Sequence, residues 1–171
     1  IAIAIRSLFF QPFYIPSSSM EPTLLVGDRI FVSKYSFGYS KHSFPFSPSI
    51  FKGRVFSAIP NRGDVIVFKT PADNRTDYIK RLIGLPGDIV YFSQGNLYIN
   101  NNQVLKKVIS SSDIIYCGNR SVPVNTFEEK LPNGKSHTSV YSQTYTYQNS
   151  DKFIVPPKYY FFLGDNRDCS K

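Results

Sequence analysis

The sequence predicts a mostly β fold, and three observations support this prediction. Aromatic residues are abundant, with 15 Phe and 12 Tyr but no Trp. The apolar runs are short and rich in β-branched and aromatic residues, which favour strands. Turn-forming residues, 12 Pro and 10 Gly, separate these runs. At 171 residues the chain is long enough for one domain, or for one domain with a large insertion.

The expected strands follow the apolar runs in chain order. The Val-Ile-Val-Phe run at residues 65–68 is too short and too β-branched for a helix. Turn residues at 85–88 and 94–96 join neighbouring strands. Residues 6–14 form an aromatic-rich approach segment, and residues 36–62 form a loop excursion. The expected strands cover residues 28–35, 64–70, 78–83, 89–92, 97–99, 153–155 and 159–163.

The composition changes to Ser, Asn, Thr and Tyr over residues 100–152. A strong turn signal at 132–135 is followed by alternating Val140, Tyr145 and Tyr147. We therefore expect an inserted β subdomain of polar character at 100–152. The core around it would consist of residues 11–99 and 153–171.

The N-terminus is apolar, with Ile-Ala-Ile-Ala-Ile at residues 1–5 followed by Arg6. Five residues cannot span a bilayer, which needs about 20. The chain does not begin with Met, and no signal peptide with a cleavage site is recognisable. We expect residues 1–10 to be the end of a transmembrane anchor in a longer protein. The alternative is an apolar first strand.

The formal net charge of +8 favours an anionic partner. The basic residues are scattered, with no basic stripe and no RNA-binding motif, so we expect no nucleic acid. A membrane surface agrees better with the apolar N-terminus. Cys117 and Cys169 lie far apart and share no metal spacing, so we expect no metal site. A disulfide between them is possible in an oxidising compartment, and the sequence leaves this pairing open.

Ser19 is the first candidate for chemistry. Pro16 and Pro22 bracket it and restrict the local backbone, which makes a stiff mount for a nucleophile. A serine attacks only when a base removes its proton. An ordinary serine-rich turn is the alternative interpretation.

Lys80 is the candidate base. On the expected strand at 78–83 it shares a face with Tyr78 and Leu82. A lysine among apolar neighbours loses hydration, which lowers its pKa and makes it a competent base near neutral or mildly alkaline pH. The strand alone equally allows a solvated lysine at a sheet edge.

A third stretch, Gly-Asp-Asn-Arg-Asp at residues 164–168, places opposite charges beside a glycine after an aromatic strand. This pattern is typical of a salt-bridged turn. It could also be a scaffold behind an active site, with Ser170 close enough in sequence to orient the lysine amine.

These stretches together resemble bacterial type I signal peptidases, also called leader peptidases. The resemblance rests on residues 13–25, 62–68, 77–88 and 164–170, in this order. They cover about a quarter of the chain and bracket nearly all of it. The resemblance implies a signal-peptidase-like β catalytic core anchored by an N-terminal membrane helix. The catalytic part would face the periplasmic or outer side of the inner membrane.

The resemblance also implies the roles of the site residues. Ser19 would be the nucleophile and Lys80 the general base. The Ser17 hydroxyl and the Ser19 backbone N–H would form the oxyanion hole, and Ser170 would orient the lysine. Shallow apolar subsites for small residues at −1 and −3 would be lined by Phe13, Ile15, Met20, Leu24, Tyr78 and Ile79.

The implied function is removal of signal peptides from exported preproteins after an Ala-x-Ala site. No metal or cofactor is needed, and the expected partners are signal peptides and membrane lipids, with the enzyme a monomer. Two departures stand out. Ser18 occupies a position where glycine is common in the family, and the family continues past Lys171 with an acidic residue, a serine and an arginine. We expect residues 1–171 alone to be inactive or unstable.

Three other functions remain open from the sequence. One is a self-cleaving Ser-Lys domain of the repressor type, with a DNA-binding module upstream. Another is a non-catalytic basic β module that binds RNA or lipid. The last is an inactive, truncated fragment.

Overall fold

The computed structural model describes residues 9–37 and 58–170. They fall into two compact units, the first with residues 9–15, 27–37 and 58–60, the second with residues 16–26 and 61–170. Strands dominate the described residues, which confirms the mostly β prediction. The one helical element among them is a single 3-10 turn, η1, at Ser18–Met20.

The first unit contains an antiparallel pair of strands, β1 (Phe10–Tyr14) and β2 (Arg29–Ser33). The sequence predicted β2 but assigned β1 to an approach segment. Pro12 explains the difference, because it lacks an N–H and counts against a central strand. In a two-stranded sheet every strand is an edge, so the proline is tolerated there.

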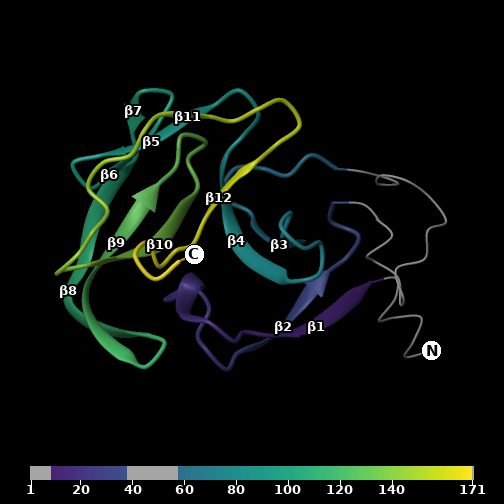
Figure 1. The fold of residues 1–171 in the computed structure, drawn as a ribbon, viewed down its shortest axis with the longest axis horizontal. Coiled ribbons are helices and arrows are strands. Elements are labelled where there is room, and N and C mark those ends of the chain that lie inside the picture. The colour runs from purple at the N-terminus through teal and green to yellow at the C-terminus, as the bar shows by residue number, and fades with distance from the viewer. Residues whose placement is uncertain (1–8, 38–57, 171) are drawn as a thin grey trace. The chain divides into compact units, whose positions relative to one another are not determined.

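The second unit is built around β4 (Asp77–Gly84), which lies between β3 (Val65–Lys69) and β12 (Phe161–Leu163) in an antiparallel sheet (Figure 1). A second sheet has the order β11-β5-β6-β7. Its strands are β5 (Ile89–Ser93), β6 (Asn96–Ile99), β7 (Asn102–Gln103) and β11 (Phe153–Ile154). The strands predicted from residue 64 to 99 and from 153 onward are all present.

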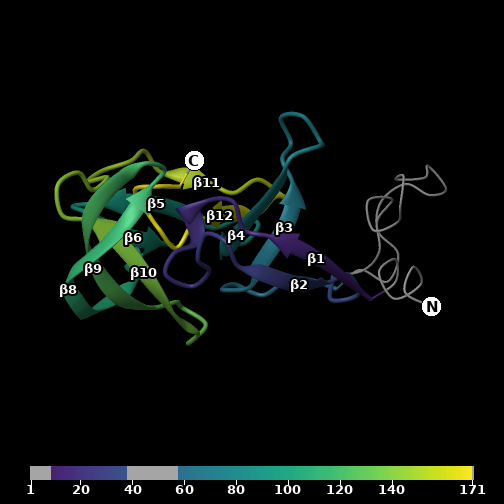
Figure 2. The ribbon, with the colours of Figure 1, turned by 90° about the horizontal axis from the view of Figure 1, so that it is seen from below.

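Three longer strands, β8 (Leu105–Cys117), β9 (Arg120–Lys130) and β10 (Ser136–Ser142), form the remaining sheet of this unit in the order β10-β9-β8. Figures 1 and 2 show β8 and β9 as a long, strongly twisted hairpin. Bulges interrupt the β8–β9 pairing between Val108 and Asp113, and bulges increase local twist.

The β10-β9-β8 sheet has a small apolar cluster of its own, and the larger core belongs mainly to the other two sheets of this unit. This core contains residues from β4, β5 and β6 together with residues of the stretch expected to be an insertion. Its fully buried members are Ile83, Val90, Leu97, Ile99, Val104, Leu131 and Val155. The predicted division of the chain at 99/100 and 152/153 stays a prediction.

Two expectations fall mainly on other parts of the chain. Most of the predicted anchor at 1–10 and most of the predicted loop at 36–62 lie outside the described residues. Within residues 9–37 and 58–170, no helix has the length and apolar character needed to cross a bilayer.

Candidate active site

The serine turn is held in place by a loop near the other end of the chain. Ser17 has an extended backbone, and the chain then closes into the single turn of η1. Asn166 binds this turn twice: its side-chain amide donates to the Ser18 carbonyl at 3.0 Å, and its backbone N–H donates to the Ser19 carbonyl at 3.2 Å. Ser19 is therefore buried and fixed at its backbone, which suits a nucleophile whose position matters.

The Ser17 hydroxyl lies beside the Ser19 hydroxyl. The two Oγ atoms are 3.4 Å apart, and either can donate. Ser17 precedes η1 at the position where serines often cap a helix, but its side chain makes no capping hydrogen bond. The hydroxyl is thus directed toward the Ser19 hydroxyl and not toward the backbone of the turn.

Lys80 lies in β4, opposite Ile66 of β3, and is only 7% exposed. Its amine donates a hydrogen bond to the Ser170 hydroxyl, with 2.8 Å between Nζ and Oγ. Burial lowers the pKa of Lys80 to about 8, and the charge of Asp165 opposes this shift. A substantial part of the amine is therefore neutral at mildly alkaline pH, as a general base requires.

Asp165, whose charge opposes the lowered pKa of Lys80, is bound by the neighbouring Arg81. Arg81 binds Asp165 through two nitrogens, at 2.7 Å from Nε and 2.6 Å from a terminal nitrogen. Thr23 donates a further hydrogen bond to Asp165 at 2.5 Å. Paired, two-point bonds of this kind are strong, so Asp165 is already engaged by Arg81.

Gly164 brings this loop into close contact with the catalytic candidates. A Cβ atom at this position would overlap both the Ser19 carbonyl oxygen and the Ser170 side chain. Only glycine permits so close an approach, which gives a physical reason for its place in the motif.

The two charged residues that follow bind different elements of the unit. Arg167 donates to Glu129 of β9 at 2.5 Å. Asp168 accepts a hydrogen bond from the Ser142 N–H at 2.7 Å and another from Thr146 at 3.1 Å. The loop from Gly164 to Ser170 therefore ties β9, the end of β10 and the serine turn to one another.

The candidates meet in one groove of about 1280 Å³. Residues from the serine turn, from β4 and from the Gly164–Ser170 loop line it. The predicted site residues that it brings together are Ser17, Ser19, Tyr78, Ile79, Lys80 and Ser170. The Lys80–Ser170 bond corresponds to the orienting role expected for Ser170.

Two of the expected subsite residues, Met20 and Leu24, do not line the groove, and two others, Phe13 and Ile15, lie in the other unit. The structure buries Met20 completely, so it is not part of the groove wall, and Leu24 does not line the groove either. The apolar side chain of Met20 packs in the protein interior and has no exposed atoms that a substrate could contact. Phe13 lies in β1 and Ile15 directly follows it, both in the first compact unit, so their subsite roles stay predictions.

Several residues of the site were not foreseen from the sequence. The β8–β9 turn contributes a wall of the groove with Tyr116, Asn119 and Arg120. Cys117 and Cys169, whose pairing the sequence left open, form a disulfide. The opposite charges of the stretches at 77–88 and 164–170 could have suggested the Arg81–Asp165 pair, but nothing in the sequence identified Asn166 as the partner of the serine turn.

The described residues contain no group of three or more His, Cys, Asp or Glu side chains arranged to hold a metal ion.

Known proteins are similar to this chain over nearly its whole length. Residues 1–171 match the family model described as "Signal peptidase, peptidase S26". The chain is 43% identical over 180 residues to a protein called signal peptidase I from Rickettsia conorii (strain ATCC VR-613 / Malish 7), covering 99% of this chain and 66% of the relative. The signal peptidase I of Rickettsia bellii (strain OSU 85-389) is 45% identical over 179 residues, covering 99% of this chain and 61% of the relative.

The chain thus spans just under two thirds of the length of these relatives. The match to the family model nevertheless extends from the first residue to the last. The chain therefore belongs to the signal peptidase family, peptidase S26.

Proposed function

We propose that this protein is a serine endopeptidase that removes signal peptides from exported preproteins with a Ser19–Lys80 dyad. The single observation that carries the proposal is the state of Lys80. It is buried beside the Ser19 groove, has a pKa lowered to about 8 by that burial, and has a hydroxyl as its hydrogen-bond acceptor. Membership of the signal peptidase family agrees with this chemistry.

The reaction passes through an acyl-enzyme. The neutral Lys80 amine takes the proton of the Ser19 hydroxyl while Ser19 Oγ attacks the carbonyl carbon of the scissile bond. The C–N bond then breaks, and the new amino terminus leaves with the proton from Lys80. A water molecule, deprotonated by the same amine, hydrolyses the ester and releases the signal peptide.

The oxyanion that forms in each step needs donors. The Ser17 hydroxyl and the Ser19 backbone N–H supply them, which accords with the position of the Ser17 hydroxyl beside Ser19 and its absence from the η1 cap. One such donor contributes about 3 kcal/mol to the transition state.

The substrate binds as an extended strand beside β4. In the described part of the chain, β12 pairs with β4 at Arg81, Leu82 and Gly84, whereas residues 77–80 pair with β3 on their other edge. This leaves one edge of residues 77–80 for main-chain pairing with a peptide. Tyr78 and Ile79 provide the apolar contacts that favour small side chains, as in an Ala-x-Ala site.

The proposed setting is the extracytoplasmic side of the inner membrane. Emerging signal peptides are presented there, and the net charge of +8 favours anionic lipid headgroups. The enzyme acts as a monomer in this proposal.

The test is cleavage of a preprotein with an Ala-x-Ala site by the full-length protein in detergent at mildly alkaline pH. The parent should cut after the second Ala, and Ser19→Ala and Lys80→Ala should not. Lys135→Ala is the matched control, because Lys135 pairs with Asp64 at the surface, outside the groove, and should leave cleavage unchanged. A folded parent that does not cut would favour a binding module, and cutting that survives both dyad substitutions would contradict the assigned roles.

A further inference from the structure

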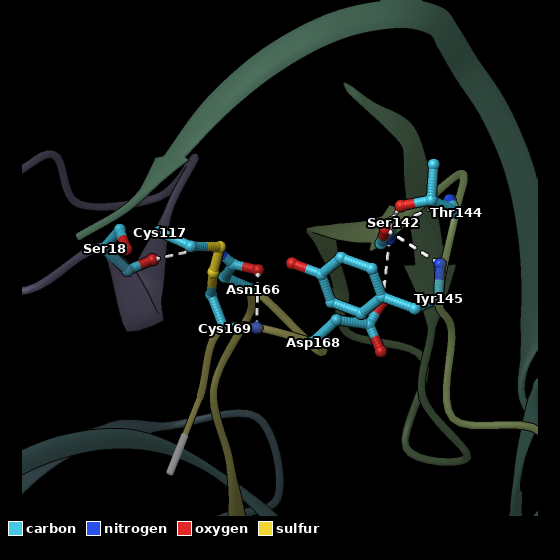
Figure 3. The surroundings of a disulfide bond; sticks show 8 residues. All are labelled: Ser18, Cys117, Ser142, Thr144, Tyr145, Asn166, Asp168 and Cys169. Atoms are coloured by element: carbon cyan, nitrogen blue, oxygen red, sulfur yellow. Dashed lines mark hydrogen bonds between the residues drawn. A yellow bond between two sulfur atoms is a disulfide. The ribbon is translucent and has the colours of Figure 1, made fainter. Parts of the chain in front are cut away.

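The disulfide between Cys117 and Cys169 joins two segments that meet at the groove. The cysteines are separated by 52 residues in sequence, and their Cα atoms lie 5.7 Å apart. Cys117 is the last residue of β8, and Cys169 precedes Ser170 in the C-terminal loop. Figure 3 shows the bond beside Ser18 and Asn166, close to the serine turn.

Cys169 is coupled to both halves of the dyad. Its neighbour Ser170 accepts the hydrogen bond from the Lys80 amine at 2.8 Å. Its own N–H donates to the Asn166 side-chain oxygen at 3.2 Å, and the amide nitrogen of the same side chain holds the Ser18 carbonyl. A displacement of residue 169 would therefore reach the lysine through Ser170 and the serine turn through Asn166.

Cys117 fixes the other segment. It packs against a small apolar cluster formed by Ile115, Val122, Val124 and Val140. It is also the first residue of the tip of the β8–β9 hairpin, whose residues Gly118, Asn119 and Arg120 line the groove. Among residues 9–37 and 58–170, β8 pairs with β9 alone, so one edge of β8 has no strand beside it there.

We propose that the Cys117–Cys169 disulfide is a positioning element of the peptidase, which holds the Ser170 hydroxyl against the Lys80 amine and holds the β8–β9 tip as a wall of the substrate groove. This proposal deepens the proposed function and rests on it. Covalent attachment at residue 169 ties the Gly164–Ser170 loop to the end of β8. It limits the drift of Ser170 and so preserves the alignment on which proton transfer depends.

The experiment compares four forms of the full-length protein: the parent, Cys117→Ser/Cys169→Ser, Ser170→Ala, and the combination of all three substitutions. Without the disulfide, kcat should fall about tenfold, the effect of one lost hydrogen bond, and KM should rise because the groove wall is released. If the disulfide acts on the amine through Ser170, its removal should lower kcat in the parent but not in Ser170→Ala. Equal kcat and KM in the parent and the double-cysteine variant, or tenfold losses that multiply with Ser170→Ala, would overturn the proposal.

Two controls separate positioning from folding. Thermal unfolding must show that each form is folded at the assay temperature. A thiol reductant should reproduce the loss of kcat in the parent and have no effect on the double-cysteine variant.

A measurement that needs no substrate tests the positioning role of the disulfide separately from the peptidase activity. Acetylation of the Lys80 amine by acetic anhydride, followed across pH by peptide mass spectrometry, reports when that amine is neutral. The midpoint should move by the same amount and in the same direction in the double-cysteine variant and in Ser170→Ala. A midpoint that moves in Ser170→Ala alone would overturn the positioning role, even if no form of the protein cleaved a preprotein.

Discussion

Two groups of buried polar side chains contact the same loop, Gly164 to Ser170. One group stabilises a buried charge, whereas the other favours the neutral form of a buried amine. In one group, Glu129 is fully buried and accepts bonds from Arg167 at 2.5 Å and Tyr141 at 2.6 Å, with His137 at 3.4 Å. In the other, the buried amine of Lys80 donates to the hydroxyl of Ser170.

The difference shows in the pKa values. Burial alone would raise the pKa of Glu129, but the charge of Arg167 and the bonds from His137 and Tyr141 outweigh it and hold that pKa at about 2. Burial lowers the pKa of Lys80 to about 8, because Asp165 opposes it only in part and is bound to Arg81. A buried charge with full partners is a structural element, whereas a buried base without a carboxylate partner is left reactive.

Replacing Lys80 tests the reactive group and should give the largest effect. Lys80→Met keeps an unbranched side chain of similar length but removes the base, so kcat/KM for preprotein cleavage should fall about 10³-fold or more. The free energy of unfolding should stay equal or rise, because no amine needs to be desolvated. A variant that lost both activity and stability would indicate that Lys80 is a structural residue like Glu129.

Replacing Glu129 tests the structural group. Glu129→Ala leaves the buried Arg167 without its carboxylate partner, and the free energy of unfolding should drop by about 3–5 kcal/mol in urea titrations. Lys135→Ala breaks the surface pair with Asp64 and should cost less than about 1 kcal/mol. If the two variants lost the same free energy of unfolding, the buried Glu129–Arg167 pair would contribute no more to stability than the surface pair.

Gly164→Ala should lower activity by displacing the side chains around Lys80 and Ser19. The added methyl group would overlap the Ser19 carbonyl and the Ser170 side chain, so we expect kcat to fall by about 10²-fold, as for a displacement of about 1 Å in an active site. Gly134→Ala is the control, since a Cβ there meets no atom within 4 Å although the residue has a positive φ of 84°. It should lower stability slightly and leave kcat unchanged, and a loss of kcat in the control would argue against steric overlap as the cause.

The pH dependence of stability tests the lowered pKa of Lys80 without a substrate. Lys80 has a pKa of about 8 in the folded chain and an ordinary value of 10.5 when unfolded. Between these values the unfolded chain binds more protons, so the contribution of Lys80 to the free energy of unfolding rises with pH. The stability difference between the parent and Lys80→Met should therefore shift in favour of the parent from about pH 8 to about pH 10.5, and a constant difference would contradict the lowered pKa.

Local patterns allowed most strands to be predicted. Short β-branched and aromatic runs between turn residues identified β3 to β6, and the alternation along β4 placed Lys80 among apolar neighbours. β1 was missed because Pro12 counts against a strand in the middle of a sheet. Only the assembled sheet shows that β1 is an edge strand, where a proline is tolerated.

The site was predictable only in part, because its residues are joined by long-range contacts. The stretches around Ser19 and Lys80 suggested the dyad. The bond from Asn166 to Ser18 spans 148 residues, and no local pattern indicates such a partner. The burial of Met20 and the groove wall at the β8–β9 tip likewise follow from tertiary packing, which sequence spacing does not encode.

The most direct test of the central claim is the titration of the Lys80 side chain by NMR in the folded full-length protein, with Lys80→Met used to assign its signal. The account predicts a midpoint near pH 8, the value set by burial. A midpoint near the ordinary lysine value of 10.5 would show that the amine stays charged at mildly alkaline pH, and Lys80 could not then be the base that activates Ser19.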